Sequence, residues 1–475
     1  MTTYSVTKSL KKEIFRAYDI RGVVNDGIDA NTVYTIGKAL ATKIKSGGRN
    51  KVIIGRDGRL SSPHLSDALI AGFITSGCDV IFIGEVPSPI LYFATFNLGI
   101  EDAVMLTGSH NPKNYNGLKM IVGGKTLSES DIKNIYDLIL NTDFTATKEG
   151  VKTDIEIIDS YIDDVCQRVN LNRPLKVVLD CGNGVASNVA PKLFENLGCE
   201  VVKLYCNVDG NFPNHHPNPS VAENLVDLID AVREYNADVG LAFDGDADRI
   251  GVVDNSGKII WPDRLMMAYS NDILQRSPGE KIVFDVKCSS LLESVIASNG
   301  GLPIQWRTGH SVLKAKMISE QAALAGEMSG HIFFKENWYG FDDGVYSGAR
   351  LLKILSATTQ SCAAFFDSFP EGINTPEIII PIAENKKFVF MKELVSKADF
   401  KDASVNTIDG LRVTFKYGWG LVRASNTTPA LTLRFEANSA ENLTKVQNIM
   451  CKYMHDVDPS LDLSSLLACE EQINA

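Results

Sequence analysis

The chain has 475 residues, of which 44% are hydrophobic and 22% charged, and these values exclude a disordered, collagen-like or fibrous protein. The 47 Lys and Arg residues and 58 Asp and Glu residues give a net charge of −11. This charge argues against a nucleic-acid or anionic-membrane partner, because phosphate contacts need clustered cations, but it leaves room for a small anionic substrate. At roughly 150 residues per domain, the length predicts three or four domains.

The cysteines and the N-terminal segment indicate a cytoplasmic protein. The nine cysteines are scattered and form no CxxC pair, which argues against a zinc ribbon and fits a reducing compartment. The first 15 residues are rich in lysine and lack the apolar run of a signal peptide. Residues 86–100 are uncharged but contain two prolines. They are also too few to span a membrane, which takes about 20 residues.

Three segments of the chain repeat one order of predicted elements. Each has a β-branched strand after a lysine, a helix, a glycine with a second apolar strand, and a third strand that runs into a polar loop. The first strands are expected at residues 51–55, 176–180 and 281–285, the second at 77–84, 198–204 and 300–306, and two of the helices at 66–75 and 189–197. This alternation predicts α/β domains with mixed, mainly parallel sheets. All α/β domains look alike at this level, but the unusual loops recur in phase with the pattern and favour a true repeat.

The pattern changes from about residue 375. Strand runs at 410–415 and 431–436 and a helix at 440–455 predict a smaller α+β domain with an antiparallel sheet. We place the four domains at residues 1–155, 156–258, 259–370 and 371–475. Ligands gather at the carboxyl ends of strands in open α/β sheets, so the polar loops of the repeats could meet at one cleft.

The loop after residues 239–243 carries the clearest chemical signal. Asp244, Asp246 and Asp248 alternate, and in an extended segment their carboxylates would converge on one point. Oxygen ligands of this kind favour a hard cation such as Mg²⁺. An EF-hand is excluded, because Arg249 stands where that loop needs glycine. A solvated acidic turn competes only weakly, and Arg249 could hold an anion beside the metal.

The other loops are more ambiguous when each is taken alone. Ser109, between Gly108 and His110, could be a nucleophile or part of a structural turn, and nearby Lys119 could join it or remain at the surface. Alternating side chains in the third loop could bind sugar hydroxyls or simply be solvated, and His310 and Lys287 are similarly undecided. The fourth loop could be a phosphate cradle or a Ser/Thr-rich turn. The third loop contributes Glu327, Ser329 and His331, and the fourth contributes Arg423, Ser425, Asn426, Thr427 and Thr428.

Together the four loops closely resemble those of the α-D-phosphohexomutase superfamily, specifically its bacterial phosphomannomutase/phosphoglucomutase members, over nearly the whole chain and in the same order. The resemblance implies four domains around one central cleft. It implies that Ser109 is a phosphoserine and that the three aspartates bind Mg²⁺ together with a phosphoserine oxygen. The third loop then binds the sugar, and Arg423, Ser425, Asn426 and Thr427 bind the phosphate that does not react. Other matching cleft positions are Tyr18, Arg21, His110, Lys119, Arg249, Lys287 and His310.

The resemblance also implies a reaction. A phosphohexomutase converts hexose 1-phosphate to hexose 6-phosphate through a hexose 1,6-bisphosphate, here of glucose or mannose because Met328 matches the dual-specific members. We expect the catalytic groups to be Ser109, His110, Arg21, Arg249, Lys119 and His331. We expect Lys119 to be the general base, with a pKa near neutrality, and His331 and His310 to be its rivals.

Several further expectations complete the prediction. The fourth domain should close by a hinge near residue 371, the protein should be a monomer or weak dimer, and residues after about 459 should form a C-terminal extension. A phosphoglucosamine mutase and a non-catalytic phosphosugar-binding protein are the alternatives. Intact Ser109 and aspartate positions disfavour the non-catalytic alternative.

Overall fold

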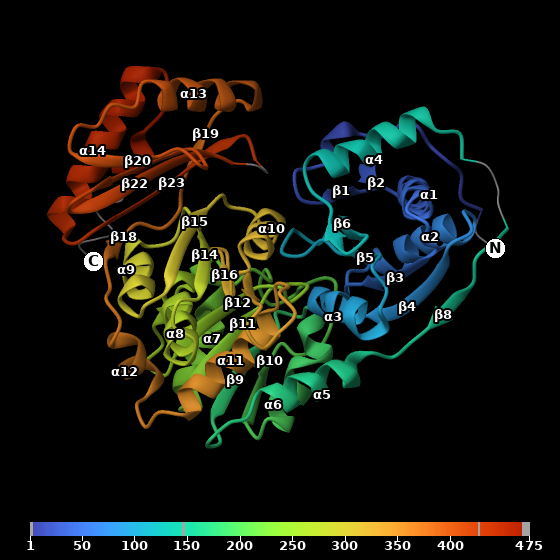
Figure 1. Ribbon diagram of the computed structural model, residues 1–475, viewed down its shortest axis with the longest axis horizontal. Coiled ribbons are helices and arrows are strands. Elements are labelled where there is room, and N and C mark those ends of the chain that lie inside the picture. Colours follow the sequence, from blue (N-terminus) through green and yellow to red (C-terminus); the bar gives the residue numbers. More distant parts are fainter. Residues whose placement is uncertain (1–2, 145–147, 426–427, 468–475) are drawn as a thin grey trace.

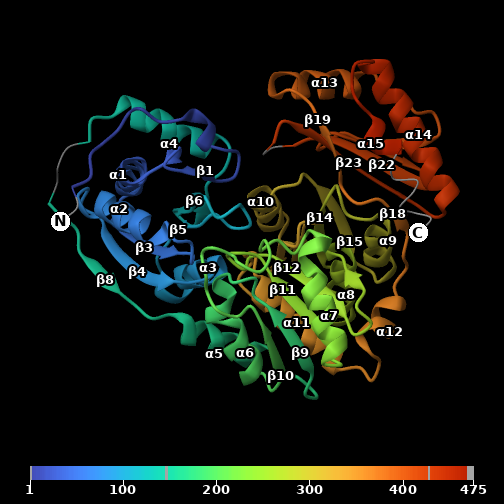
Figure 2. The same cartoon turned by 180° about the vertical axis from the view of Figure 1, so that it is seen from behind.

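Four β-sheets, one for each successive part of the chain, organise the computed structural model, which describes residues 3–144, 148–425 and 428–467. The N-terminal and C-terminal domains lie on either side above the two central domains (Figure 1). Figure 2 shows the same arrangement from behind, with the first and last domains separated by the ends of the central ones. Among the described residues, no helix is long and apolar enough to cross a membrane.

The first three sheets share one strand order, which confirms that the sequence pattern is a repeated α/β unit. In each, the first strand lies between the second and third, all parallel, and a fourth strand pairs antiparallel with the third. In spatial order the strands are β4 (Asp79–Glu85), β3 (Lys51–Arg56), β5 (Ala103–Leu106) and β6 (Tyr115–Val122); β10 (Glu200–Leu204), β9 (Lys176–Asp180), β11 (Val239–Phe243) and β12 (Ile250–Asp254); and β15 (Leu302–Trp306), β14 (Lys281–Asp285), β16 (Leu324–Gly326) and β17 (Ile332–Phe334).

Short strands extend the first two sheets. The first sheet gains β1 (Ile20–Val24), β2 (Gly27–Ile28), β7 (Lys125–Thr126) and β8 (Lys152–Asp154), and the second gains β13 (Ile259–Ile260). Because β12 and β13 pair antiparallel, with Val253 opposite Ile259, the second sheet continues two residues past the expected boundary at 258.

Alternation along the buried strands divides the core of the first domain. Val52 and Ile54 of β3 belong to a cluster with α1 (Ala30–Ser46) and α2 (Ser62–Ile74). Ile53 points to the opposite face and packs with α3 (Ser88–Leu98). The cluster around α3 continues into the next two domains, so α3 joins the first domain to the rest of the molecule.

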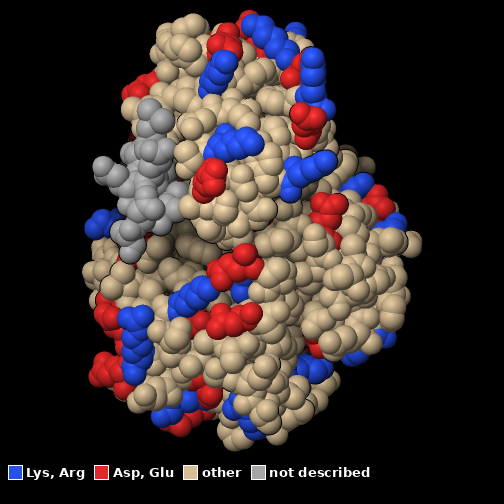
Figure 3. Space-filling model, turned by 90° about the vertical axis from the view of Figure 1, so that its left-hand side faces the viewer, with Lys and Arg blue, Asp and Glu red and all other residues tan. Residues whose placement is uncertain are grey.

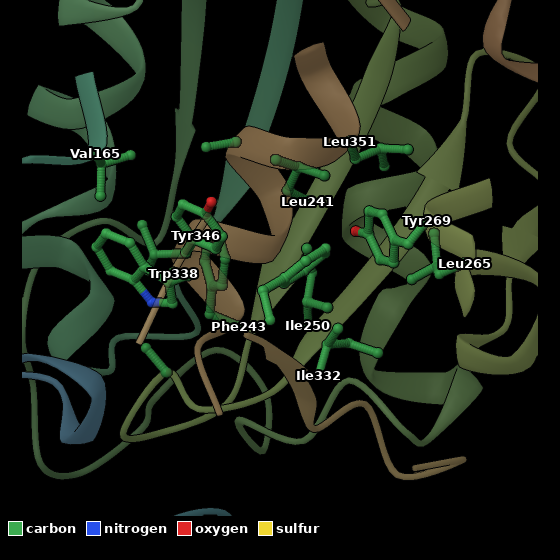
Figure 4. Packing of buried hydrophobic residues seen from close by; sticks show 14 of the residues in the cluster. Val165, Leu241, Phe243, Ile250, Leu265, Tyr269, Ile332, Trp338, Tyr346 and Leu351 are labelled. Atoms are coloured by element: carbon green, nitrogen blue, oxygen red, sulfur yellow. The ribbon is translucent and has the colours of Figure 1, made fainter. Parts of the chain in front are cut away.

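The second and third domains share a hydrophobic core. Leu241 and Phe243 of β11 pack near Tyr346 and Leu351 of α11 (Gly344–Ser356), as Figure 4 shows. Most residues of α11 are buried, because this helix contacts the second sheet as well as elements of the third. The remaining helices of the first three domains are α4 (Ser130–Asn141), α5 (Ile158–Arg168), α6 (Ala190–Asn196), α7 (Val226–Glu234), α8 (Pro262–Arg276), α9 (Ser290–Ser298), α10 (His310–Glu320) and α12 (Cys362–Asp367), with short 3₁₀ helices at Lys12–Ile14, Val185–Asn188 and Ala222–Leu225.

The fourth domain has the predicted α+β architecture. Its antiparallel sheet has the order β18 (Ile373–Asn374), β23 (Ala430–Ala437), β22 (Gly418–Ala424), β21 (Leu411–Phe415) and β20 (Ala403–Asn406), with β19 (Ile378–Pro381) also on β23. The helices α13 (Glu384–Ser396) and α14 (Ala440–Val457) pack on this sheet. Leu463 and Leu466 are buried in the same core, so the described part of the expected C-terminal extension is an integral part of the domain.

Candidate active site

The predicted loops meet at one cleft with a volume of about 1030 Å³, to which all four domains contribute. Three of the loops occupy equivalent places, between the third and fourth strands of their sheets, which is why the repeat brings them together. The predicted residues that line the cleft are Tyr18, Arg21, Ser109, His110, Lys119, Arg249, Lys287, His310, Glu327, Ser329, His331, Arg423 and Ser425. Asn426 and Thr427 lie outside the described residues.

Ser109 lies on the turn between β5 and β6 in a left-handed conformation, with φ of 47°. Its N–H donates to Thr107 Oγ1 at 2.8 Å. Its hydroxyl donates to Asp244 Oδ2 at 2.8 Å and lies 3.2 Å from His110 Nδ1. Burial, together with nearby Arg249, lowers the pKa of His110 well below its usual value, so this imidazole is neutral. The serine hydroxyl therefore lies between the Asp244 side chain and a neutral imidazole.

A buried arginine that the sequence reasoning missed organises the Ser109 turn. Arg59 is 1% exposed and donates to Ser109 O and Asn111 O at 2.6 Å each. It also donates to Pro112 O at 2.6 Å and Tyr115 O at 3.1 Å. Asp57 pairs with Arg59 and accepts the Gly108 N–H at 3.0 Å. The available signal was the polar, glycine-containing stretch directly after β3, which is the same position relative to a strand as the other loops.

The three aspartates converge beneath the cleft, but not in the extended segment expected from the sequence. Residues 244–248 form a turn, in which Ala247 N–H donates to Asp244 O at 3.0 Å and Ala247 has φ of 60°. Ligand oxygens of all three aspartates lie within 4.8 Å of one another, and all three residues are fully buried. Burial and the neighbouring carboxylates raise the pKa of Asp244 to about 8. Such crowding of acidic groups is stabilised by a cation.

Lys119 supplies one cation, and its pKa differs from the expected one. Its ammonium group donates to Asp246 Oδ2 at 2.6 Å and also pairs with Asp248. Burial by itself lowers the pKa of Lys119, but the two carboxylates outweigh this effect and hold the pKa well above its usual value. The expectation of a lysine with a pKa near neutrality is therefore wrong for this arrangement, because its strongest neighbours are anions.

The third loop is a tight turn between β16 and β17 rather than an extended polar edge. Glu327 N–H donates to His331 O at 2.9 Å, and the Ser329 hydroxyl donates to Glu327 Oε2 at 2.7 Å. His331 Nε2 accepts the Nε–H of Arg249 at 2.9 Å. Its Nδ1 lies 3.0 Å from Asp342, a buried carboxylate that the sequence reasoning did not identify. His331 thus connects the third loop to Arg249 of the second.

His310 and Tyr18 border the same loop from other elements. His310 begins α10 and stacks on His331 with ring centroids 5.3 Å apart. Burial lowers the pKa of His310 to about 4. Tyr18 donates its hydroxyl to Thr308 O at 3.0 Å, which joins the first domain to the third.

The fourth loop is held by a second missed cation. Lys387 of α13 is 1% exposed and donates to Ser425 O at 2.7 Å and Thr428 O at 3.0 Å. Arg423 pairs with Asp409 at 3.1 Å, while its buried Nη2 atom has no hydrogen-bond partner within the described parts of the chain. Such an arginine nitrogen at the edge of a cleft suits an oxyanion.

Further side chains connect the cleft walls. Lys287, from the loop after β14, lies 3.2 Å from Glu377 of the fourth domain. Arg21 pairs with Asp19 and donates to Asn111 beside the Ser109 turn. Acidic and basic side chains are interspersed on the face seen in Figure 3. The geometry can bind an anionic group at the Arg423 end while Ser109 faces a reacting group at the other.

Four family models match successive parts of the chain. They are phosphoglucomutase/phosphomannomutase alpha/beta/alpha domain I at residues 12–146, domain II at 159–257, domain III at 261–372, and the C-terminal domain at 377–452.

Several proteins and structures are similar over nearly full length. A phosphomannomutase/phosphoglucomutase of Pseudomonas putida is 51% identical over 458 residues, which cover 96% of this chain and 99% of that protein. A phosphoglucomutase of Neisseria gonorrhoeae is 48% identical over 443 residues, covering 93% and 96% of the two chains. The crystal structure of a phosphoglucomutase/phosphomannomutase family protein from Burkholderia thailandensis superposes with a TM-score of 0.91 at 42% identity, covering 95% of this chain and 99% of that one.

Proposed function

The chain belongs to the phosphoglucomutase/phosphomannomutase family, and from this premise we propose that it interconverts hexose 1-phosphate and hexose 6-phosphate through a phosphorylated Ser109. Mannose and glucose are the proposed sugars. The observation that carries the proposal is the position of the Ser109 hydroxyl, which lines the cleft and donates to Asp244 at 2.8 Å.

The proposed reaction has two phosphoryl transfers. In the first, the bond between phosphorus and Ser109 Oγ breaks as a bond to the free sugar hydroxyl forms, and the hydroxyl proton passes to a base. The resulting hexose 1,6-bisphosphate turns around in the cleft. Its other phosphoryl group then returns to Ser109, and the sugar oxygen regains a proton. Positioning and charge stabilisation provide most of the catalysis in such transfers.

The anchor for the phosphate that does not react is proposed at the fourth loop. Arg423 has a buried, unpartnered Nη2 atom within the described region, and Lys387 fixes the loop backbone beside it. The cleft must accept the sugar in both orientations. One fixed anion site meets this requirement when it is combined with adaptable contacts from Glu327 and Ser329, which line the cleft, to the sugar hydroxyls.

The aspartate turn is proposed to hold Mg²⁺, with a phosphate oxygen of Ser109 as a further ligand. The fit rests on two buried carboxylate oxygens, Asp246 Oδ1 and Asp248 Oδ1, which lack hydrogen-bond partners within the described parts of the chain. An all-oxygen donor set suits this ion. When bound, Mg²⁺ polarises the phosphoryl oxygens. Lys119 and Arg249 balance the remaining negative charge of the aspartates and the phosphoserine.

The proton acceptor is proposed to be His310. Lys119 pairs with Asp246 and Asp248, which hold its pKa well above the usual range and keep it protonated. His331 accepts a hydrogen bond from Arg249 through Nε2, and its pKa is raised, since Asp248 and Asp342 outweigh the lowering effect of burial. His310 lines the cleft and is neutral at pH 7 because burial lowers its pKa to about 4.

A Ser109→Ala variant tests the phosphoserine. It should lose mutase turnover, whereas a control with another serine of the first domain removed, Ser76→Ala in the turn after α2, should retain it. Intact-mass measurement of the unsubstituted protein after incubation with hexose 1,6-bisphosphate should reveal one added phosphate at Ser109. Turnover by Ser109→Ala at the rate of the control would refute the proposed role.

The sugar preference is tested by kcat/KM on the 1-phosphates of mannose, glucose and glucosamine. Met328 lines the cleft. Its match to the dual-specific members of the family supports mannose and glucose over glucosamine. Preference for glucosamine 1-phosphate would replace this proposal by a phosphoglucosamine mutase. Binding of glucose 6-phosphate without isomerisation would indicate a non-catalytic phosphosugar-binding protein. The domain boundaries at 155, 258 and 370, the cytoplasmic location and the monomer or weak dimer stay predictions.

A further inference from the structure

Two cysteines of the second domain have their thiols in contact. Cys181 directly follows β9 and Cys206 follows β10, and these parallel strands are neighbours in the sheet (Figure 1). Their Sγ atoms are 3.3 Å apart, and Cys181 N–H donates to Leu204 O at 3.2 Å, which holds the strand ends together. Both cysteines are free thiols. Two such sulfurs need only a small approach to reach the disulfide bond length of about 2.05 Å.

The two thiols differ in exposure and acidity. Cys181 is fully buried, whereas Cys206 is partly exposed. The interaction with the Cys181 thiol lowers the pKa of Cys206 and outweighs the opposite effect of burial. The same interaction, together with burial, raises the pKa of Cys181 well above its usual value. Cys206 is therefore the more acidic and more exposed thiol of the pair, and Cys181 is the buried thiol beside it.

We propose that Cys181 and Cys206 form an oxidative modification site, which a hydroperoxide converts to a disulfide. The Cys206 thiol releases its proton and the resulting thiolate attacks one oxygen of the peroxide. The O–O bond breaks, a sulfenic acid forms, and the other oxygen takes up the proton and leaves as water or an alcohol. The Cys181 sulfur then attacks the Cys206 sulfur, and the sulfenic hydroxyl leaves with the Cys181 proton as water while the S–S bond forms. Two thiols are oxidised and one peroxide is reduced. A dithiol such as dithiothreitol restores both thiols.

The position of Cys181 connects this pair to the aspartate turn. Gly182 and Asn183 follow it with φ of 49° and 59°, a tightly constrained loop. Val185 N–H donates to Gly245 O at 3.2 Å, and a Cβ on Gly184 would lie only 2.8 Å from that oxygen. Gly245 in turn stands between Asp244 and Asp246. Movement of Cys181 toward Cys206 therefore shifts the loop that supports the aspartates, and we expect the disulfide to lower mutase turnover reversibly.

The test uses the full-length protein supplied with Mg²⁺ and treated with hydrogen peroxide. Peptide mapping without reduction should find the Cys181–Cys206 bridge, and dithiothreitol should remove it. A Cys206→Ser variant should form no bridge, while Cys199→Ser, a control just before β10, should form it normally. If Cys206→Ser folds poorly, alkylation of the unsubstituted protein after peroxide treatment provides the second measurement. Cys181 and Cys206 should then lose their reactivity toward the alkylating reagent together.

The chemical and functional readouts are separable. Bridge mapping does not depend on the proposed mutase activity, whereas the loss of turnover rests on it. Turnover of the unsubstituted protein and of Cys199→Ser should fall with bridge formation and return with dithiothreitol, while Cys206→Ser should keep its turnover in peroxide. Absence of the bridge after peroxide treatment, or oxidation of Cys206 to a sulfinic acid with Cys181 still reduced, would overturn the proposal.

Discussion

Replacing Arg59 by methionine should loosen the Ser109 turn more than the same replacement of Arg56, the last residue of β3. Arg59 donates to the backbone oxygens of Ser109, Asn111, Pro112 and Tyr115, and its partner Asp57 is 2% exposed. Methionine keeps part of the buried volume but none of these hydrogen bonds. The carbonyls and the carboxylate would then remain buried without the cation that they surround.

The expected loss in the free energy of unfolding follows from the burial of the Arg59–Asp57 ion pair. Removing one partner of a buried ion pair costs about 3–5 kcal/mol, because the other charge is left uncompensated. Asp57 still accepts the Gly108 N–H at 3.0 Å and the Ser62 hydroxyl, which places the estimate toward the lower end of that range. A displacement of the nucleophile by about 1 Å can cost about 100-fold in rate, so kcat should fall by this order. KM should change little, since Arg59 does not line the cleft.

The assay combines thermal unfolding with steady-state kinetics. Arg56→Met is the matched control, because Arg56 ends β3 three residues before Arg59 and pairs with Glu85 at 2.8 Å in a partly exposed ion pair. Such a pair contributes about 0–1 kcal/mol. We expect a clear loss of Tm and kcat in Arg59→Met and a small effect in the control. Equal Tm and kcat in the two variants would refute the proposed role of Arg59. The Ser109 turn would then keep its conformation without this side chain.

Three further changes test other parts of the site. Lys387→Met should raise KM for hexose 1-phosphate more than it lowers kcat, because the phosphate loop loses two hydrogen bonds, whereas Lys392→Met on the exposed side of α13 should leave KM unchanged. In metal-free protein, the Asp244 pKa of about 8 lies above that of an unfolded aspartate, so the native state retains a proton that the unfolded state has lost. Stability should therefore fall as the pH rises from about 4 to 8, by up to about 1.4 kcal/mol per pH unit from this group. Denaturant unfolding in chelator measures the slope, which should be smaller in Asp244→Asn; a slope unchanged by this substitution contradicts the assignment. His310→Gln should lower kcat at every pH and remove the acidic limb of the pH–rate profile, and survival of that limb would assign the proton transfer to another group.

Much of the fold could be predicted because its signals are local. The β-branched strands, the helices between them and the polar loops after them follow from periodicity over a few residues, and the three sheets have the repeated order that these signals indicate. Ser109 and the aspartates of residues 244–248 were identifiable for the same reason, since each lies on an unusual loop directly after an apolar strand. The sharing of α11 between two domains was not identifiable, because the residue pattern of a helix does not indicate which sheet it packs on.

The sequence by itself determined which residue types stand on the loops, and only the tertiary structure decided what surrounds them. Arg59 and Lys387 act on loops 50 and 38 residues away along the chain, so their roles depend on contacts that no local pattern contains. Lys119 illustrates the same limit for electrostatics. Its pKa is set by Asp246 and Asp248, which are remote in sequence and adjacent in space. A buried charge interacts most strongly with its nearest neighbours, and the tertiary structure determines which groups those are.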